Sequence, residues 1–559
     1  MRSDDAAILA ADRLSDEPVV GTVVEPDDDV GEFVFATRDE QAVSTGEFVA
    51  YSQCVVGSED DEIILARVNN RERESGLPTS FMADPTVDAD QVATTLGAEA
   101  DGCELYRITA SVIGYYDPEF ESFRNPRQLP SSGTSLYRAP GEMLEVVIPK
   151  VKPPSHRDND EPDPGMAQMG RLLNRTDERV SVELPVNEIA ATHLAILAST
   201  GSGKSYTASV LLEEMLKPDT RASVLVFDPH GEYESLDQMC DHEAFQGADG
   251  YRPAVELRRS DQLSVKLADL TFDDFYSILE PTQRMSSVLN DALGDLQDEE
   301  SFTASQLLTA CHSNHPDGQA SGLKWRINRH IVQSDFFDAY DPLDLDDLVN
   351  PGQVTVFQMG GLTRRDQQVM AAVLLRKMYA SREASVVGNP DDVQSEIDHP
   401  VFTLFEEAHR FAPDGDSQAL PIIRQVNSEG RKFGLGTGLI SQRPSKLDET
   451  VLSQCGTQIT MNITNPNDQQ AIRNSIENAG EAVLEELPGL TKGQAIISGD
   501  AVNTPVLSKI RNRHTEHKAD SLSADQLWRE AYDDANGAPS TSKPAHSDES
   551  GVFDGEEEI

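Results

Sequence analysis

The chain has 559 residues, 38% of them hydrophobic, so it is too long for one core and has enough apolar side chains for two to four folding units. No stretch approaches the roughly 18 apolar residues of a membrane helix, and the acidic N-terminus lacks the charge pattern of a signal peptide. The five cysteines are scattered without a C-x-x-C pair, which argues against a zinc site or a disulfide framework. We therefore expect a cytoplasmic protein that does not associate with a membrane.

The formal net charge of −51 comes from 97 acidic and 46 basic residues. Such a charge could repel nucleic acid or favour basic partners. It could equally be a solvated acidic surface, and the even spread of acids over all segments favours this second interpretation. The composition resembles that of proteins from salt-accumulating halophilic archaea, so it indicates where the protein works rather than what it does.

Short β-rich runs separated by acidic turns occupy residues 17–116, among them EPVVGTVVEP, GEFVFATRD and LYRITASVIGYY. Runs of this length and spacing predict a small β-barrel, which we assign to residues 1–149. A stretch rich in proline and charge follows, KVKPPSHRDNDEPDPGMAQMG. It predicts a linker at residues 150–183.

From residue 184 the pattern changes to apolar strands that alternate with helices. The candidate strands are HLAILAS, ASVLVFDP, QVTVFQM, VFTLFEEA, GTGLISQ, TQITMNI and GQAIIS. This alternation predicts an α/β core with a largely parallel sheet over residues 184–513. Residues 260–346 read as an acidic, mostly helical insertion without a strand. We expect residues 514–559 to form an acidic tail that is largely disordered apart from a short helix around Trp528.

The stretch LAILASTGSGKSYTASVLLEEML, residues 194–216, combines an apolar strand, a glycine-containing loop ending in Lys-Ser and an amphipathic helix. Glycines allow the loop backbone to turn its N–H groups toward a phosphate, and the helix adds its positive N-terminal end. Ala198 stands at the first position of the G-x-x-x-x-G-K-[ST] pattern, where a small residue suffices unless φ is positive. We predict a phosphate loop rather than a fortuitous strand-to-helix turn.

In this loop the Lys204 ammonium would reach the β- and γ-phosphates of ATP, and the Ser205 hydroxyl would be a ligand of Mg²⁺. The predicted nucleotide-binding residues are Ser199, Thr200, Gly201, Ser202, Gly203, Lys204, Ser205 and Tyr206.

The stretch VFTLFEEAHRF, residues 401–411, is an apolar strand that ends in two carboxylates. Such a strand brings acids to the metal ion and the attacking water at the carboxyl edge of the sheet. Strand alternation predicts that Glu406 and Glu407 point to opposite sides. We assign Glu406 to the metal and Glu407 to the water. The alternative is a pair of surface acids at a strand end.

Two further strand ends carry polar residues toward the same edge. VFDPHGEY contributes Asp228, His230 and Glu232, and GLISQRPSKLD contributes Gln442, whose amide could sense the γ-phosphate. Taken alone, His230 is more typical of a packed, hydrogen-bonded histidine than of a catalyst.

The stretch LPIIRQVNSEGRKFGLG places Arg424 and Arg431 seven residues apart, on one stripe if the helix continues through Gly430. Phosphoryl transfer builds charge that an arginine from a neighbouring subunit can meet. Either residue is therefore a candidate for such a trans-acting finger. The alternative is a cation that faces the helix dipole or the acidic surface.

Five motifs in this order, ASTGSGKS, FDPHGEY, FEEAHRF, SEGRKFGLG and SQRPS, resemble the HerA family of archaeal hexameric DNA translocases and helicases. The resemblance covers about residues 184–513, and the β-rich N-terminal region is similar to the barrel that precedes the ATPase core in that family. It implies a RecA-like P-loop NTPase core of the HerA–FtsK class that uses ATP and Mg²⁺. It also implies a homohexameric ring around double-stranded DNA that works with the NurA nuclease in DNA end resection and double-strand break repair.

Carried over residue by residue, the resemblance supports Lys204 and Ser205 on phosphate and Mg²⁺ and Asp228 near the nucleotide. It makes Glu407 the catalytic acid, Arg431 the trans finger and Gln442 the sensor. The chain departs from the family pattern at two positions, where Ala198 replaces Gly and Glu406 replaces Asp.

Two basic clusters are candidates for DNA contact. They are LKWRINRH, with Lys324, Arg326 and Arg329, and GGLTRRDQQ, with Arg364 and Arg365. At molar salt the Debye length is about 3 Å, so local cations matter more for a phosphate backbone than the distant acidic surface. Each cluster could instead pair with nearby surface acids.

Two other functions remain open from the sequence. A related ring ATPase of conjugation, virus packaging or antiviral defence would share every ATPase motif. A nucleotide-switched scaffold would bind ATP without moving DNA, although Glu407 beside a candidate finger argues for hydrolysis. The sequence does not separate the first of these from a DNA translocase.

Overall fold

The computed structural model describes residues 13–14, 17–26, 31–39, 42–55, 61–75, 104–117, 122–150, 165–175, 178–297, 299–314, 321–338, 344–388, 395–475, 485–516, 528–529 and 532. The chain divides into two compact units, residues 1–515 and 516–559. The first contains all the strands described below, and most of the predicted acidic tail lies outside the described residues. Among the helices that the structure describes, none has the length and apolar character needed to cross a membrane.

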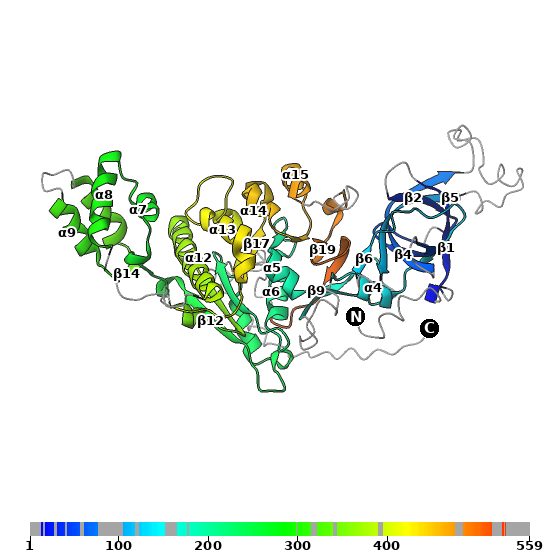
Figure 1. Ribbon diagram of the computed structural model, residues 1–559, viewed down its shortest axis with the longest axis horizontal. Helices are drawn as coiled ribbons and strands as arrows, with labels where there is room; N and C mark the ends of the chain where they lie inside the picture. The colour runs from blue at the N-terminus through cyan, green and yellow to red at the C-terminus, as the bar shows by residue number, and fades with distance from the viewer. Residues whose placement is uncertain are drawn as a thin grey trace, which may run out of the picture. The chain divides into compact units, whose positions relative to one another are not determined.

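The N-terminal region is a closed antiparallel barrel of six strands, as predicted (Figure 1). The barrel closes because β5 pairs with β2 as well as with β4, for example at Phe33 opposite Ala110. Phe33, Phe35 and Tyr51 fill its interior and are fully buried. In barrel order the strands are β2 (Glu32–Thr37), β1 (Val19–Pro26), β7 (Ser135–Arg138), β3 (Phe48–Cys54), β4 (Asp61–Ser75) and β5 (Glu104–Asp117), and β6 (Ser122–Arg124) extends β5.

The core is built on one sheet of 11 strands. Seven neighbouring strands are parallel, in the order β12 (Ala254–Arg259), β15 (Gln353–Gln358), β11 (Ser223–Asp228), β16 (Val401–Phe405), β17 (Leu435–Ser441), β10 (Leu194–Leu197) and β18 (Thr457–Thr460). Four antiparallel strands continue the sheet beyond β18, namely β19 (Gln494–Gly499), β20 (Val506–Ile510), β8 (Met166–Leu172) and β9 (Ser181–Pro185). The predicted parallel α/β core is therefore confirmed.

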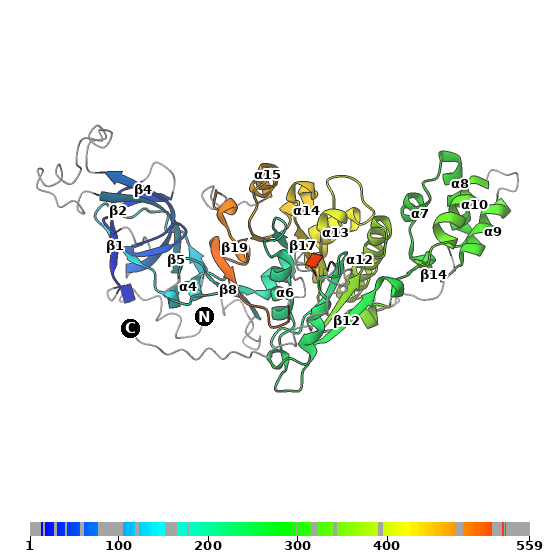
Figure 2. The same cartoon turned by 180° about the vertical axis from the view of Figure 1, so that it is seen from behind.

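Both faces of the sheet are covered, which explains why its central strands are almost uniformly apolar. Side chains of β10 alternate between two hydrophobic cores, with Ala195 and Leu197 in one and Leu194 and Ile196 in the other. The first core is closed by α12 (Arg364–Val387), α13 (Leu420–Glu429) and α14 (Glu449–Ser453), and the second by α6 (Lys204–Met215) and α4 (Gly141–Val147). Figure 2 shows α6 next to β8.

The insertion is mainly helical, as expected, and its helices gather into one group (Figure 1). The expectation that it contains no strand is wrong, since β13 (Val265–Lys266) and β14 (Phe337–Asp338) form a two-residue parallel pair. Pairs this short carry no readable alternation, because alternation needs several residues. The helices are α7 (Phe272–Leu279), α8 (Gln283–Asp295), α9 (Ala304–Asn314), α10 (Ser321–Ile327), the π-helix η8 (Asn328–Val332) and α11 (Leu345–Leu348).

Four strands of the core sheet lie where no strand was expected. β8 and most of β9 fall within the expected linker of residues 150–183, β12 lies at the sheet edge and β20 at the end of the core. β12 reads AVELRR, and its charged residues suit a half-exposed edge rather than a buried strand. The remaining α-helices that the structure describes in the core are α5 (Val186–Thr192) and α15 (Pro466–Ser475).

Candidate nucleotide and active site

The predicted phosphate loop connects β10 to α6, at the carboxyl edge of the parallel strands. Gly201 and Gly203 have φ angles of 83° and 108°, which favour glycine over any other residue. Ala198 is fully buried and is not among the residues with positive φ, so alanine fits the first position of the motif. Its N–H donates to the carbonyl of Ser441, and the N–H of Ser199 donates to the carbonyl of Asn462. The loop is thus anchored to the two strands that flank β10.

The loop ends at the N-terminus of α6, where the backbone can receive an anion. Gly203 is the N-cap and no side chain caps the helix, so its first N–H groups have no partner from the preceding turn. The first helical residue is Lys204, whose ammonium is largely buried. Uncapped N–H groups, a helix dipole and a buried cation together fit a phosphate chain.

Both predicted carboxylates meet at this lysine. The Lys204 ammonium forms an ion pair with Glu406 and lies 3.2 Å from Glu407 Oε1. The expectation that the two acids point to opposite sides is therefore wrong. β16 ends at Phe405, and Glu407 adopts a left-handed conformation with φ of 50°, so strand alternation no longer applies. Glu406 and Glu407 are 0% and 3% exposed.

Tyr233, which was not among the predicted site residues, completes the cluster. The Tyr233 hydroxyl donates to Glu406 Oε2 at 2.7 Å, and the ring is fully buried. Asp228 shapes the turn that brings it there, because its carboxylate accepts the N–H groups of His230, Gly231 and Tyr233 at 3.1, 2.8 and 3.3 Å. The sequence signal was the tyrosine that closes the motif FDPHGEY. His230 and Glu232 are exposed.

Burial sets the electrostatics of the cluster. Desolvation raises the pKa of Glu406 to about 7, against the opposing effects of the Lys204 ammonium and the Tyr233 hydroxyl. Burial alone would lower the pKa of Lys204, but Glu406 and Glu407 outweigh it and raise that pKa. Burial also raises the pKa of Asp228, although four backbone N–H groups oppose the shift. A buried ammonium between two carboxylates can exchange one anionic partner for a phosphate.

Gln442 and His409 complete the surroundings of the loop. Gln442 follows β17, and its Oε1 accepts a hydrogen bond from the Thr200 hydroxyl, so the predicted sensor touches the phosphate loop. His409 Nδ1 lies 3.2 Å from Glu407 Oε2. His409 stands in the motif FEEAHRF but was not among the predicted site residues.

The structure separates the two finger candidates. The Arg424 guanidinium is held by Asp448 through two hydrogen bonds, whereas that of Arg431 makes no hydrogen bond or ion pair within the described part of the chain. The α-helix ends at Glu429, and Arg431 lies on a short 3₁₀ turn, Gly430–Phe433, so the two residues do not share one α-helical stripe. Arg431 lies before the start of β17, at the amino edge of the parallel strands and away from its own phosphate loop.

Three of the four arginines in the basic clusters bind backbone carbonyls. Arg326 donates to the carbonyl of Leu279 and Arg365 to that of Ile278, both at the end of α7. Arg364 donates to the carbonyls of His409 and Arg410. These bonds give the side chains a structural role, and their contact with DNA stays a prediction.

The chemistry around the loop fits a magnesium ion that arrives with its nucleotide. In the described ranges no three His, Cys, Asp or Glu side chains gather as a metal cluster. The Ser205 side chain, at the start of α6, and the Glu406 carboxylate are the oxygen donors beside the loop. Because Mg²⁺ in such sites takes few protein ligands and several phosphate oxygens, this donor set suffices.

Comparison with known proteins identifies the family. The model for the central domain of helicase HerA matches residues 167–378, and the model for the helicase HerA-like C-terminal region matches residues 369–508. The DNA double-strand break repair helicase HerA of Saccharolobus solfataricus is 30% identical over 367 residues, which cover 62% of this chain and 68% of that protein. The chain belongs to the HerA helicase family. The resemblance drawn from the five motifs is thereby confirmed.

A second HerA, that of Pyrococcus furiosus, is 26% identical over 530 residues, or 86% of this chain and 90% of its own. Among solved structures, VirB4 of Thermoanaerobacter pseudethanolicus is similar with a TM-score of 0.47 and 15% identity, over 63% of this chain and 98% of that chain. The HerA family models extend from β8 to β20 and so include the strands that lie in the expected linker.

Proposed function

We propose that this HerA-family protein is an ATP-driven motor that moves along double-stranded DNA in the cytoplasm as a homohexameric ring. We further propose that it acts with a NurA-type nuclease in the resection of broken DNA ends. The curated relatives with the HerA name are called DNA double-strand break repair helicases, which supports the repair role.

One observation supports the assembly of subunits into a ring. Lys204 and the two carboxylates stand at the carboxyl edge of the sheet, whereas Arg431 stands at the amino edge with its guanidinium unpaired within the described residues. Arg431 is exposed, so its guanidinium is accessible to another subunit. A head-to-tail ring brings the amino edge of one copy to the carboxyl edge of the next. Each nucleotide site would then be built from two subunits.

The residues have distinct tasks in this proposal. Bound MgATP supplies the phosphoryl group and the divalent charge. Lys204 and the N–H groups at the start of α6 hold the phosphates, while Ser205 and Glu406 are the metal ligands. Glu407 accepts the proton of the attacking water, and Arg431 of the adjacent copy meets the charge that develops. Gln442, bonded to Thr200, links the phosphate loop to β17 and acts as the sensor.

Contact with DNA is proposed for the exposed side of the insertion. Trp325 is 60% exposed there, and the Arg329 guanidinium lies 5.7 Å from the centre of its ring. An aromatic face beside cations suits a nucleic acid. Lys324 shares helix α10 with Trp325, and Arg326, Arg364 and Arg365 remain secondary candidates because backbone carbonyls hold them.

The test is ATP hydrolysis in high-KCl buffer, with and without linear duplex DNA. Wild type is compared with Lys204→Ala, Glu407→Gln and Arg431→Ala, and each variant is also co-assembled with the others. We expect DNA to stimulate the wild type and each variant alone to be inactive. Mixing Arg431→Ala with Lys204→Ala should restore hydrolysis, because an intact Arg431 then faces an intact Lys204.

Two outcomes would reject the proposal. If hydrolysis is robust but is not stimulated by DNA, the protein belongs among ATPases with a protein substrate, such as the related ring ATPases or a nucleotide-switched scaffold. Activity that survives in Arg431→Ala alone would reject a site shared between subunits.

A further inference from the structure

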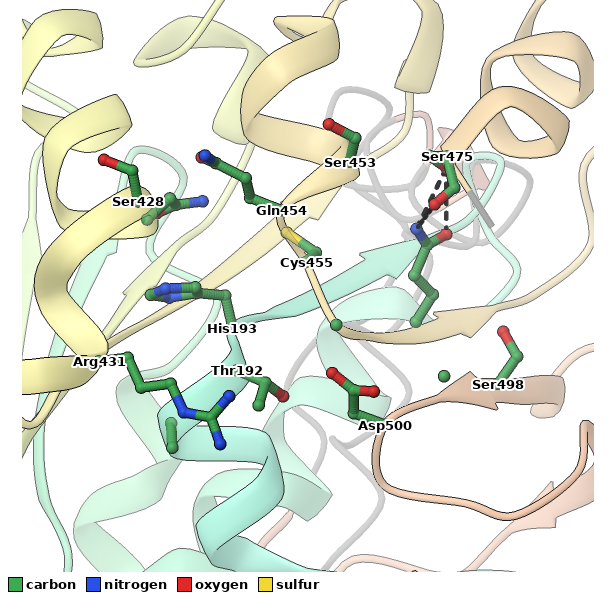
Figure 3. A pocket seen from close by; sticks show the side chains of 15 residues that line it. Thr192, His193, Ser428, Arg431, Ser453, Gln454, Cys455, Ser475, Ser498 and Asp500 are labelled. Atoms are coloured by element: carbon green, nitrogen blue, oxygen red, sulfur yellow. Dashed lines mark hydrogen bonds between the residues drawn. The ribbon is translucent and has the colours of Figure 1, made fainter. Parts of the chain in front are cut away.

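Arg431, which has no partner among the described residues, lines a polar cavity of about 320 Å³ (Figure 3). The cavity lies where α5, α13 and α14 lead into β10, β17 and β18, on the edge of the sheet opposite the phosphate loop. His193 also lines it, directly before β10, and is 3% exposed. Its Nε2 is buried without a hydrogen-bond partner in the part of the chain that the structure describes.

A buried chain of hydrogen bonds starts at this histidine. The Thr437 N–H donates to His193 Nδ1 at 3.1 Å, so Nδ1 of the neutral ring is the acceptor and Nε2 carries the proton. The Thr437 hydroxyl donates its one proton to Asn427 Oδ1 at 2.8 Å, so its 3.1 Å contact with Nδ1 is not a hydrogen bond. Thr437 is thus joined to His193 by its backbone N–H and to Asn427 by its hydroxyl. Thr437 and Asn427 are 0% and 6% exposed. We call these three residues the His193 relay.

The relay joins three elements that carry the predicted chemistry. His193 precedes β10, whose other end is the phosphate loop, and Thr437 lies in β17, which ends just before Gln442. Asn427 lies in α13, four residues before Arg431. His193 has φ of 61° and ψ of 150°, a conformation that residues other than glycine hold only where their surroundings fix it. The relay is such a fixing point.

We propose that Asn427, Thr437 and His193 are positioning residues that hold the Arg431 segment against the roots of β10 and β17, and so set where Arg431 meets the nucleotide of the adjacent subunit. This inference rests on the proposed ring. The relay has no contact with its own phosphate loop. Its loss therefore impairs the site of the neighbour and leaves ATP binding by its own subunit intact.

The test uses a matched pair at Thr437. Thr437→Val keeps the shape but removes the hydroxyl, whereas Thr437→Ser retains it. Ser428→Ala is the control inside the cavity, because within the described residues the Ser428 hydroxyl binds only the carbonyl of Gln425 in its own helix. With duplex DNA present, we expect Thr437→Val to lower kcat roughly 10- to 100-fold, as small misplacements of catalytic groups do, with the KM for ATP within about twofold of wild type. Thr437→Ser and Ser428→Ala should stay close to wild type.

Co-assembly separates positioning from a folding defect. Thr437→Val mixed with Lys204→Ala should hydrolyse ATP well above the sum of the two separate preparations, as Arg431→Ala mixed with Lys204→Ala does. Asn427→Ala provides a second variant with the same expectation if Thr437→Val is poorly folded. Suppose that Thr437→Val raises the KM for ATP and does not recover when mixed with Lys204→Ala, whereas Arg431→Ala does recover. The proposed positioning role of the relay would then be wrong. Failure of the Arg431 mixture itself would instead reject the ring.

Discussion

Arg424 and Asp448 form a two-point ion pair, with Nε to Oδ1 at 3.1 Å and the terminal nitrogen to Oδ2 at 2.6 Å. Arg424 is the main cause that lowers the pKa of the Asp448 carboxyl. Asp448 in turn caps α14 by accepting the N–H of Val451. Arg424 is therefore committed within its own subunit, which leaves Arg431 as the candidate that can serve another.

Arg424→Ala should keep ATP hydrolysis close to wild type. The pair is half exposed on the arginine side, so its loss should lower the free energy of unfolding by less than about 1 kcal/mol. Arg431→Ala should show the reverse, with hydrolysis lost and the melting temperature unchanged. Thermal unfolding and hydrolysis measured on both variants check this. If Arg424→Ala is inactive and recovers when it is mixed with Lys204→Ala, Arg424 and not Arg431 is the trans finger.

Tyr233→Phe should weaken the binding of Mg²⁺ at the active site without abolishing hydrolysis. The variant removes the hydrogen bond that holds Glu406 but leaves the carboxylate in place. Loss of a partner that orients a metal ligand typically costs about 10-fold or more in metal affinity. We expect the Mg²⁺ concentration for half-maximal hydrolysis to rise about 10-fold, with a loss of stability of about 1 kcal/mol. An unchanged Mg²⁺ titration would contradict a role of Tyr233 in orienting Glu406 toward the metal.

His193 should make the protein less stable in mild acid. Burial lowers its pKa from 6.5 to about 4. Below pH 6.5 the unfolded chain binds a proton that the folded chain refuses, so stability is lost as the pH falls from 6.5 toward 4. At pH 5.0 this loss is about 2 kcal/mol, from 1.5 pH units at ~1.36 kcal/mol each.

The measurement is denaturant unfolding of wild type and His193→Gln between pH 8 and 5. The difference in the free energy of unfolding between wild type and His193→Gln should not change with pH above pH 6.5. Between pH 6.5 and 5.0 it should shift by about 2 kcal/mol in favour of His193→Gln. If the unfolding free energies of the two proteins change in parallel over the whole pH range, the His193 imidazole is not held neutral by burial.

Glu213 should prove one of the most sensitive positions in the core. Its carboxylate, 0% exposed, accepts the N–H groups of His514 and Thr515 and pairs with Arg511 at 2.9 Å. Breaking a buried ion pair costs about 3–5 kcal/mol, so Glu213→Gln should lower the melting temperature clearly. Glu243→Gln, at an exposed glutamate, is the matched control and should stay within about 0.5 kcal/mol of wild type. Equal melting temperatures for the two variants would show that the contacts of Glu213 with Arg511, His514 and Thr515 do not stabilise the core.

The sequence predicted the structure best in segments where every residue meets the same physical requirement. The parallel strands were predictable because burial on both faces makes them continuously apolar, as in β11 and β16, both fully buried. The phosphate loop was predictable because Gly201, Gly203 and Lys204 have fixed tasks at fixed spacing.

Prediction failed where a residue does not follow the pattern typical of its strand or turn, or where its contact lies far away in the sequence. The carboxylates of Glu406 and Glu407 converge because the strand ends at Phe405, before either acid, and Glu407 has a positive φ. Tyr233 contacts Glu406 across 173 residues, a pairing that no local pattern encodes. β12 has mixed polarity because it lies at an edge, and strands of that kind resemble exposed loops in sequence.

Helix α6 is fastened at both ends. Its first turn follows the phosphate loop, and near its last turn Glu213 and Glu214 are tied to Arg511, while Glu214 also accepts the N–H of Gln168 in β8. These contacts couple the phosphate loop, through α6, to β8 and to the segment around Arg511. If the proposed motor moves its phosphate loop during the ATP cycle, β8 and Arg511 should move with it, and a distance probe placed there would record the motion.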